Sequence, residues 1–273
     1  MKLFPINAGD FYCDGGAIFG VVPKKVWQKR YPCTDDNLCK LSMRCLLVDI
    51  DDKLILIDTG CGNKQMNYLR FFNFKESVNF EDELQRIGYS CAAVTDVVLT
   101  HLHFDHCGGC TYYDDKELKL TFPNATHWVG EQQWQNYLNP NVREGNSYFP
   151  ENMMPVHESG QLKLLKCDTF LSENVELRLY DGHSLAQIAP YINNPDTNEK
   201  IVYVGDVIPL AAALPVAWVA AYDIDPIASM KAREKLLKEA AANDFTLFFE
   251  HDAYVERIKV KDVNGKYLMK SNL

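Results

Sequence analysis

Four apolar runs of this sequence end directly before a histidine or an aspartate. They are residues 97–100 before His101, 177–182 before His183, 202–205 before Asp206 and 247–250 before His251. Short apolar runs of this kind predict buried strands. Strand ends on a rigid scaffold can place side chains so that they converge on one rim. The pattern therefore restricts the chain to a sheet-based fold that carries polar groups at the strand ends.

The densest group of possible metal ligands is the run HLHFDHCGG, which contains His101, His103, Asp105 and His106. Imidazole and carboxylate groups suit zinc and similar divalent ions. There is no obvious thiolate ligand, which argues against a closed structural zinc site. We therefore expect an open catalytic metal site, the alternative being histidines that are only packed or solvated. Gly108 and Gly109 are expected to let the backbone turn tightly after the run.

Strand and helix patterns alternate along the chain. Residues 45–50 and 54–57 predict a hairpin around Asp51-Asp52, and alternating apolar residues predict a strand over 175–180. Asn79 is a predicted N-cap of a short helix, and Asp225-Pro226 opens a longer helix that ends near residue 242. This mixture predicts an α/β fold.

The motifs resemble those of the metallo-β-lactamase superfamily between residues 46 and 252. The residues that carry the resemblance are the His-x-His-x-Asp-His run at 101–106, Asp58-Thr59-Gly60, Gly182-His183-Ser184, Gly205-Asp206 and His251. The resemblance implies an αββα four-layer sandwich. We expect a single domain over residues 1–273, with insertions near 61–80 and 136–155.

The resemblance also implies a role for each possible ligand. His101, His103 and His183 would bind one metal ion, Asp105, His106 and His251 a second, and Asp206 would bridge the two. The expected cofactor is a pair of divalent ions, with zinc first and manganese, iron or cobalt as alternatives. Two such ions acidify a shared water, so hydroxide is the expected nucleophile. Asp105 and Asp206 are the expected catalytic residues, Asp105 passing a proton to the leaving group, while Asp58 would orient ligands by hydrogen bonding.

Within the superfamily, residues 41–64, 101–109 and 222–252 are most similar to the N-acyl-homoserine lactone lactonases. Pro209 is a departure, because some lactonases have at this place a tyrosine that assists at the carbonyl oxygen, and Tyr222 is the candidate substitute. Lactones are the expected substrates. The alternatives are a phosphotriesterase or arylesterase of the same fold, and a metal-dependent binding protein without turnover.

Several segments allow two interpretations. The aromatic stretch at 67–80 can cap an acyl group, form a dimer contact or pack in the core, and 136–155 can form a lid. The apolar segment 208–221 can line a pocket or pack in the core. Cys107 and Cys110 are expected to be small buried side chains, and His127 and His157 are expected to lie outside the site.

Composition limits the partners. With 28 basic and 37 acidic residues the net charge is -9, which disfavours binding to nucleic acid or to anionic lipid. No stretch is apolar enough to span a membrane, and the N-terminal residues lack the pattern of an export signal. Nine cysteines without a regular framework favour reduced thiols, so we expect a cytoplasmic enzyme with a small-molecule ester or lactone substrate that can form a homodimer.

Overall fold

The computed structural model describes residues 1–75 and 77–270. The chain packs as two compact units, which we call the first unit (Met1–Phe11 and Ser42–Cys167) and the second unit (Tyr12–Leu41 and Asp168–Leu273). Among the described residues, none of the helices has both the length and the apolar character needed to cross a membrane. The expectation of a single domain stays a prediction.

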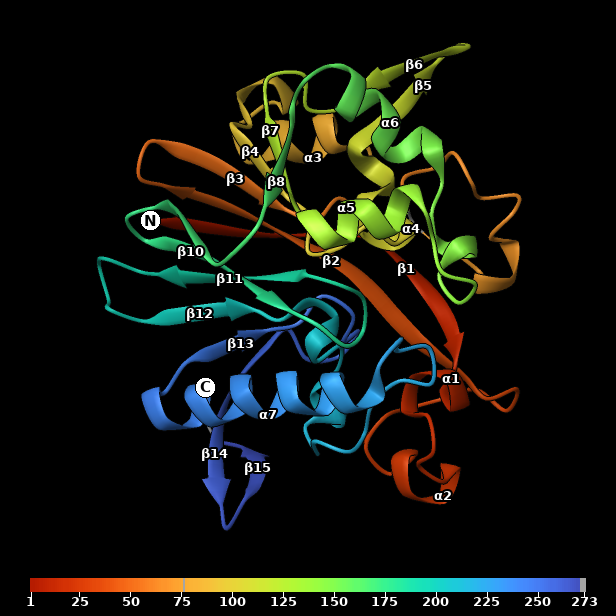
Figure 1. Cartoon of the computed structure of the whole chain (residues 1–273), viewed down its shortest axis with the longest axis vertical. Helices are drawn as coiled ribbons and strands as arrows, with labels where there is room; N and C mark the ends of the chain where they lie inside the picture. The colour runs from red at the N-terminus through yellow and green to blue at the C-terminus, as the bar shows by residue number, and fades with distance from the viewer. Residues whose placement is uncertain (76, 271–273) are drawn as a thin grey trace. The chain divides into compact units, whose positions relative to one another are not determined.

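A six-stranded sheet includes most of the strands of the first unit (Figure 1). In spatial order its strands are β1 (Lys2–Asp14), β2 (Leu38–Ile50), β3 (Lys53–Ile57), β4 (Asp96–Val98), β7 (Thr126–Gly130) and β8 (Leu162–Leu165). Strands β3, β4, β7 and β8 are parallel neighbours. Because carboxyl ends of parallel strands meet at one edge, the residues that follow β3 and β4 are brought together.

The predicted hairpin is formed by β2 and β3, which pair antiparallel with Ile50 opposite Lys53. The two turn residues, Asp51 and Asp52, have φ of 52° and 59°. This left-handed conformation matches the right-handed twist of the flanking strands, and aspartate tolerates it better than most residues. The hairpin prediction is confirmed.

The remaining elements of the first unit are short. They are the helices α3 (Phe80–Arg86), α4 (Phe104–Cys107), α5 (Glu131–Leu138) and α6 (Pro150–Glu158), and the two-stranded sheet of β5 (Thr111–Asp114) and β6 (Glu117–Leu120). Asn79 caps α3 as predicted, because its side chain accepts a hydrogen bond of 2.9 Å from the Glu81 N–H.

A seven-stranded sheet belongs to the second unit. Its order is β15 (Lys266–Met269), β14 (Arg257–Val263), β13 (Thr246–Phe248), β12 (Lys200–Tyr203), β11 (Gln187–Asn193), β10 (Val175–Tyr180) and β9 (Thr169–Ser172). The parallel pair β12 and β13 confirms the strands predicted before Asp206 and His251. The unit also contains α1 (Gly15–Phe19), α2 (Lys24–Trp27) and α7 (Pro226–Asn243), and Figure 1 shows α7 running beside β13 and β14.

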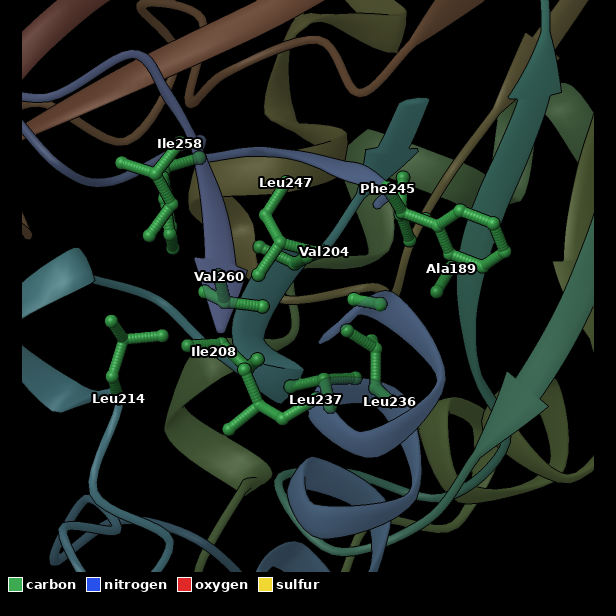
Figure 2. Packing of buried hydrophobic residues seen from close by; sticks show 14 of the residues in the cluster. Ala189, Val204, Ile208, Leu214, Leu236, Leu237, Phe245, Leu247, Ile258 and Val260 are labelled. Carbon is green, nitrogen blue, oxygen red and sulfur yellow. The ribbon is translucent and has the colours of Figure 1, made fainter. Parts of the chain in front are cut away.

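The core of the second unit lies between α7 and its sheet (Figure 2). Leu236 and Leu237 of α7 are at most 1% exposed and belong to one apolar cluster with Val204 and Leu247. Fully burying a side chain of this size stabilises the fold by about 1.5–3 kcal/mol. Ile208 is fully buried in the same cluster, so the start of the 208–221 segment packs in the core.

The start of α7 gives a stability prediction. Asp225 Oδ1 accepts hydrogen bonds of 3.0 Å from the N–H groups of both Ile227 and Ala228. Replacing Asp225 with alanine is expected to lower the free energy of unfolding by about 1 kcal/mol, because both helix donors lose their acceptor. Urea denaturation would measure this against Lys231→Ala on the exposed face of α7. Equal stability of the two variants would contradict the capping role.

Candidate metal centre

The HLHFDH run begins just after β4 and continues into α4. His103 is the N-cap residue of α4, whose four residues contain Asp105 and His106. His101 and His106 are fully buried, and Asp105 is 9% exposed. His101 Nε2 lies 2.8 Å from His103 Nδ1. Two ring nitrogens of the first unit are thus close neighbours.

Asp58, which follows β3, holds His106. Its Oδ2 lies 3.1 Å from His106 Nδ1, and its two oxygens accept 2.7 Å hydrogen bonds from the N–H and hydroxyl groups of Thr100. An imidazole that donates through Nδ1 keeps its lone pair on Nε2. His106 Nε2 lies 3.9 Å from Asp105 Oδ1. The contacts place Asp58 where it can orient the His106 ring, and its role toward a metal ligand stays a prediction.

The two glycines after the run are required for a different reason from the one predicted. Gly108 has a right-handed helical backbone with φ of −62°, so it does not need glycine for a left-handed turn. A Cβ atom on Gly108 would lie 2.2 Å from the Cys61 carbonyl oxygen, and one on Gly109 would lie 2.2 Å from that of Thr59. Close approach to the backbone of residues 59–61 excludes a side chain at both positions.

Gly109→Ala is therefore expected to destabilise the protein by about 3 kcal/mol, because the clash is with backbone and cannot be relieved by a rotamer change. The matched control is Gly145→Ala, since a Cβ atom there would meet its nearest neighbour, Pro140, at 3.9 Å. Thermal unfolding of both variants measures the difference. A Gly109→Ala protein as stable as the control would show that the two segments do not approach each other so closely.

In the second unit, Asp206 lies between two histidines. Its Oδ2 is 3.2 Å from His183 Nε2, and its Oδ1 is 3.0 Å from His251 Nε2. All three side chains are buried. The two oxygens of one carboxylate thus face different imidazoles, which is the arrangement expected of a carboxylate that contributes one oxygen to each of two ions.

His183 is oriented by a carboxylate that the sequence did not predict. Its Nδ1 lies 3.0 Å from Oδ1 of the buried Asp223. Gly182, which precedes His183, has φ of 133°, and a Cβ atom there would lie 2.3 Å from the Ser229 backbone nitrogen, so the position requires glycine.

The Tyr222 ring contacts the His183 ring edge to face, with centroids 5.6 Å apart. The predicted substitute for the missing tyrosine therefore lies beside one of the predicted ligands.

A second unpredicted carboxylate contacts His103. Glu144 is 2% exposed and its Oε1 lies 3.1 Å from His103 Nε2. Each carboxylate is distant in sequence from the histidine that it contacts, so no local pattern pairs the two. Glu144 lies in a segment rich in polar residues, which does not distinguish it from a surface residue, whereas Asp223 lies in the 222–252 stretch that carries the lactonase resemblance, which was the one available signal.

The donor set fits divalent metal ions. Ligand nitrogens bind zinc at about 2.0–2.1 Å, so two donors of one ion lie within roughly 4 Å of each other. The pair His101 and His103 meets this limit in the first unit, and Asp206 meets it with His183 and with His251 in the second. Histidine and aspartate side chains of both units can therefore bind metal. Their nitrogen and oxygen donors suit zinc, manganese, iron or cobalt.

The other candidate residues lie outside these clusters, as predicted. Cys107 and Cys110 are fully buried, and burial raises the pKa of the Cys110 thiol to about 12. His127 is buried on β7, where burial lowers its pKa to about 4, so it is a neutral structural residue. His157 lies exposed on α6 with its ring 5.1 Å from that of Trp134.

The stretch at 61–80 is partly packed, and Glu76 within it lies outside the described residues. Phe72 and Phe74 contact Phe104 of the HLHFDH run, with ring centroids 5.4 and 6.1 Å apart, whereas Phe71 is 63% exposed. Residues 77–80 also line a cavity of about 600 Å³. In the other stretch, 136–155, residues 136–138 end α5 and residues 150–155 begin α6, and residues 139–149 form the expected loop between them.

The sequence profile described as the metallo-beta-lactamase superfamily matches residues 44–251, well over half of the chain. The chain belongs to the metallo-β-lactamase superfamily. A solved structure of a probable metal-dependent hydrolase from Staphylococcus aureus is 28% identical, with a TM-score of 0.89 over 100% of this chain and 98% of that one. The predicted metallo-β-lactamase-like α/β fold is confirmed.

Relatives in the superfamily include lactonases. N-acyl homoserine lactonase AiiA of Bacillus thuringiensis subsp. kurstaki is 22% identical over 82% of this chain and 86% of its own length. The dizinc quorum-quenching lactonase AidC, in complex with a product, is 22% identical with a TM-score of 0.79, covering 99% and 94% of the two chains. The probable metallo-hydrolase Rv2300c of Mycobacterium tuberculosis (strain H37Rv) is 29% identical over 34% of each chain, so the match spans about a third of its length.

Proposed function

We propose that the protein is a dinuclear metal-dependent hydrolase in which the two units form one metallo-β-lactamase domain. His101, His103 and His183 would hold one ion, Asp105, His106 and His251 the other, and Asp206 both. The observation that carries this proposal is that each oxygen of Asp206 faces a different histidine. In the first unit, His101 lies beside His103 and Asp105 lies beside His106, so each of these pairs can supply two ligands to one of the two ions.

Two bound divalent ions would acidify a shared water and polarise the carbonyl or phosphoryl oxygen of the substrate. The residues of the chain set the geometry of this chemistry. Asp58 and Asp223 fix the rings of His106 and His183 by hydrogen bonds to their Nδ1 atoms, so Nε2 carries the lone pair of each. Asp105, a carboxylate at the edge of the cluster, is the proposed proton donor to the leaving oxygen.

Lactones are the proposed substrates. The similarity to N-acyl homoserine lactonase AiiA over most of both sequences supports this class. Tyr222, beside His183, is the proposed hydroxyl group that assists at the lactone carbonyl oxygen. The exposed Phe71, whose ring is tilted against that of Phe72 with centroids 4.3 Å apart, offers apolar surface for an acyl chain.

A second candidate is a phosphotriesterase or arylesterase activity of the same site. Pro209 favours it, because this residue has no hydroxyl where some lactonases have the assisting tyrosine. Specificity is the ratio of kcat/KM values, so the two candidates are separated by measuring that ratio directly.

The test is a substrate panel on metal-reconstituted protein, in which acyl-homoserine lactones, simple lactones, aryl esters and a phosphotriester are compared under identical conditions. We expect kcat/KM for an acyl-homoserine lactone to exceed that for the other classes by at least roughly tenfold. A phosphotriester or aryl ester as the best substrate would establish the second candidate. Metal-loaded, folded protein that turns over no ester would refute the hydrolase proposal.

A further inference from the structure

Glu144 collects four hydrogen bonds on its buried carboxylate. Oε1 lies 2.7 Å from the Tyr148 hydroxyl and 3.1 Å from His103 Nε2, and Oε2 lies 2.7 and 2.5 Å from the amide nitrogens of Asn136 and Asn141. An ionised carboxylate has about four acceptor sites and no donor. These four neighbours are enough to fill them.

The neighbours of Glu144 are held in place by each other. The Tyr148 hydroxyl accepts 2.9 Å hydrogen bonds from the amide nitrogens of Gln133 and Asn136, so its own proton is directed to Glu144. Asn136 Oδ1 in turn accepts from the Asn141 amide at 3.3 Å. Tyr148, Asn136 and Gln133 are all at most 8% exposed. The network is therefore rigid and fixes the position of the carboxylate.

The consequence for His103 follows from its two ring nitrogens. The Tyr148 hydroxyl and the Asn136 and Asn141 amides all donate to the Glu144 oxygens. The contact between Glu144 and His103 Nε2 is therefore a hydrogen bond when His103 donates its Nε2 proton. A neutral imidazole that donates through Nε2 has its lone pair on Nδ1. Nδ1 is the atom that lies 2.8 Å from His101 Nε2.

We infer that Glu144 is a positioning residue of the metal centre, which holds His103 in the tautomer and ring orientation that direct Nδ1 at the ion shared with His101. The inference rests on the proposed function, since it requires that His103 is a ligand. It also gives the segment from Asn136 to Tyr148, part of the stretch for which a lid was predicted, a role in supporting a proposed metal ligand.

Removing the negative charge should weaken one ion and spare the other, because Glu144 contacts His103, which is proposed as a ligand of the first ion. In Glu144→Gln, competition with a chromophoric chelator is expected to show one zinc ion bound about 10–100-fold more weakly and the other unchanged. Tyr148→Phe, which removes one donor to Glu144, should cause a smaller change in the same ion. Glu158→Gln, exposed at the end of α6, is the control and should match the wild type.

A spectroscopic measurement on the wild type covers the case in which Glu144→Gln does not fold. In metal-free protein with ¹⁵N-labelled histidine, long-range proton–nitrogen correlation is expected to show His103 protonated at Nε2. Protonation at Nδ1 instead would overturn the inference.

The outcomes separate the two proposals. Unchanged binding of both ions in Glu144→Gln, or equal weakening of both with a matching loss of thermal stability, would overturn the role of Glu144 and leave the hydrolase proposal intact. A wild-type protein that binds no metal would refute the hydrolase proposal, and the role of Glu144 with it.

Discussion

Replacing Asp206 with asparagine is expected to lower kcat/KM for the best ester substrate by roughly 10³-fold or more, with little change in fold. The amide has nearly the shape of the carboxylate, so the surrounding packing stays. It has one oxygen in place of two and carries no charge. Only one of the contacts to His183 Nε2 and His251 Nε2 can then be made by an oxygen, and one ion loses its shared ligand.

The matched control is Asp262→Asn in the same unit, where the exposed side chain accepts from the Gly265 N–H at 2.8 Å, which an amide oxygen can also do. Circular dichroism and a kinetic assay on both variants separate folding from chemistry. If Asp206→Asn retained more than about a tenth of the wild-type kcat/KM, the proposed shared ligand would be wrong, since a change of that size is only about 1.4 kcal/mol.

Removal of metal is expected to abolish turnover and to lower the melting temperature by roughly 10 °C. The proposed ligands come from separate parts of the sequence, and ions bound only by the folded chain stabilise it by about 4 kcal/mol when free metal is at 1,000 times Kd. Without them, buried donors such as His101 Nε2 and His103 Nδ1, 2.8 Å apart, lose a common cation.

Differential scanning calorimetry before and after chelation measures this effect, and addition of zinc, manganese, iron or cobalt to the stripped protein tests its reversal. His127→Gln is a useful control, because that buried histidine lies on β7 and is not among the proposed ligands. The melting temperature of His127→Gln should fall on chelation by as much as that of the wild type. A melting temperature that does not change on chelation would mean that the ions contribute nothing to the folded state.

Local sequence patterns predicted the elements that carry the proposed ligands. The Asp51-Asp52 turn, the Asn79 and Asp225 caps and the strands before Asp206 and His251 all form as expected, because each depends on neighbours in the sequence. The HLHFDH run and Asp58 were also singled out from the sequence as parts of the site, because they follow predicted strands and have side chains that can bind metal or accept hydrogen bonds.

Tertiary contacts explain what the sequence did not predict. Glu144 and Asp223 lie about 40 residues from the histidines they contact, and no local pattern reveals such a pair. The prediction that Gly108 and Gly109 allow a tight turn was wrong for the same reason. A side chain at these positions would collide with the backbone of Cys61 and Thr59, which is distant in sequence. Residues 136–155 looked like a loop because Asn, Pro and Gly dominate their composition, whereas buried contacts of Asn136 and Tyr148 order the segment.

The central claim, a centre of two metal ions, is tested most directly by counting metal ions per chain. Protein that has been reconstituted and then dialysed against metal-free buffer is analysed by inductively coupled plasma mass spectrometry, beside Asp206→Asn and Asp262→Asn. Two equivalents in the wild type and in Asp262→Asn, with a loss of at least one in Asp206→Asn, is the predicted result. One equivalent or none in active wild-type protein would contradict the claim.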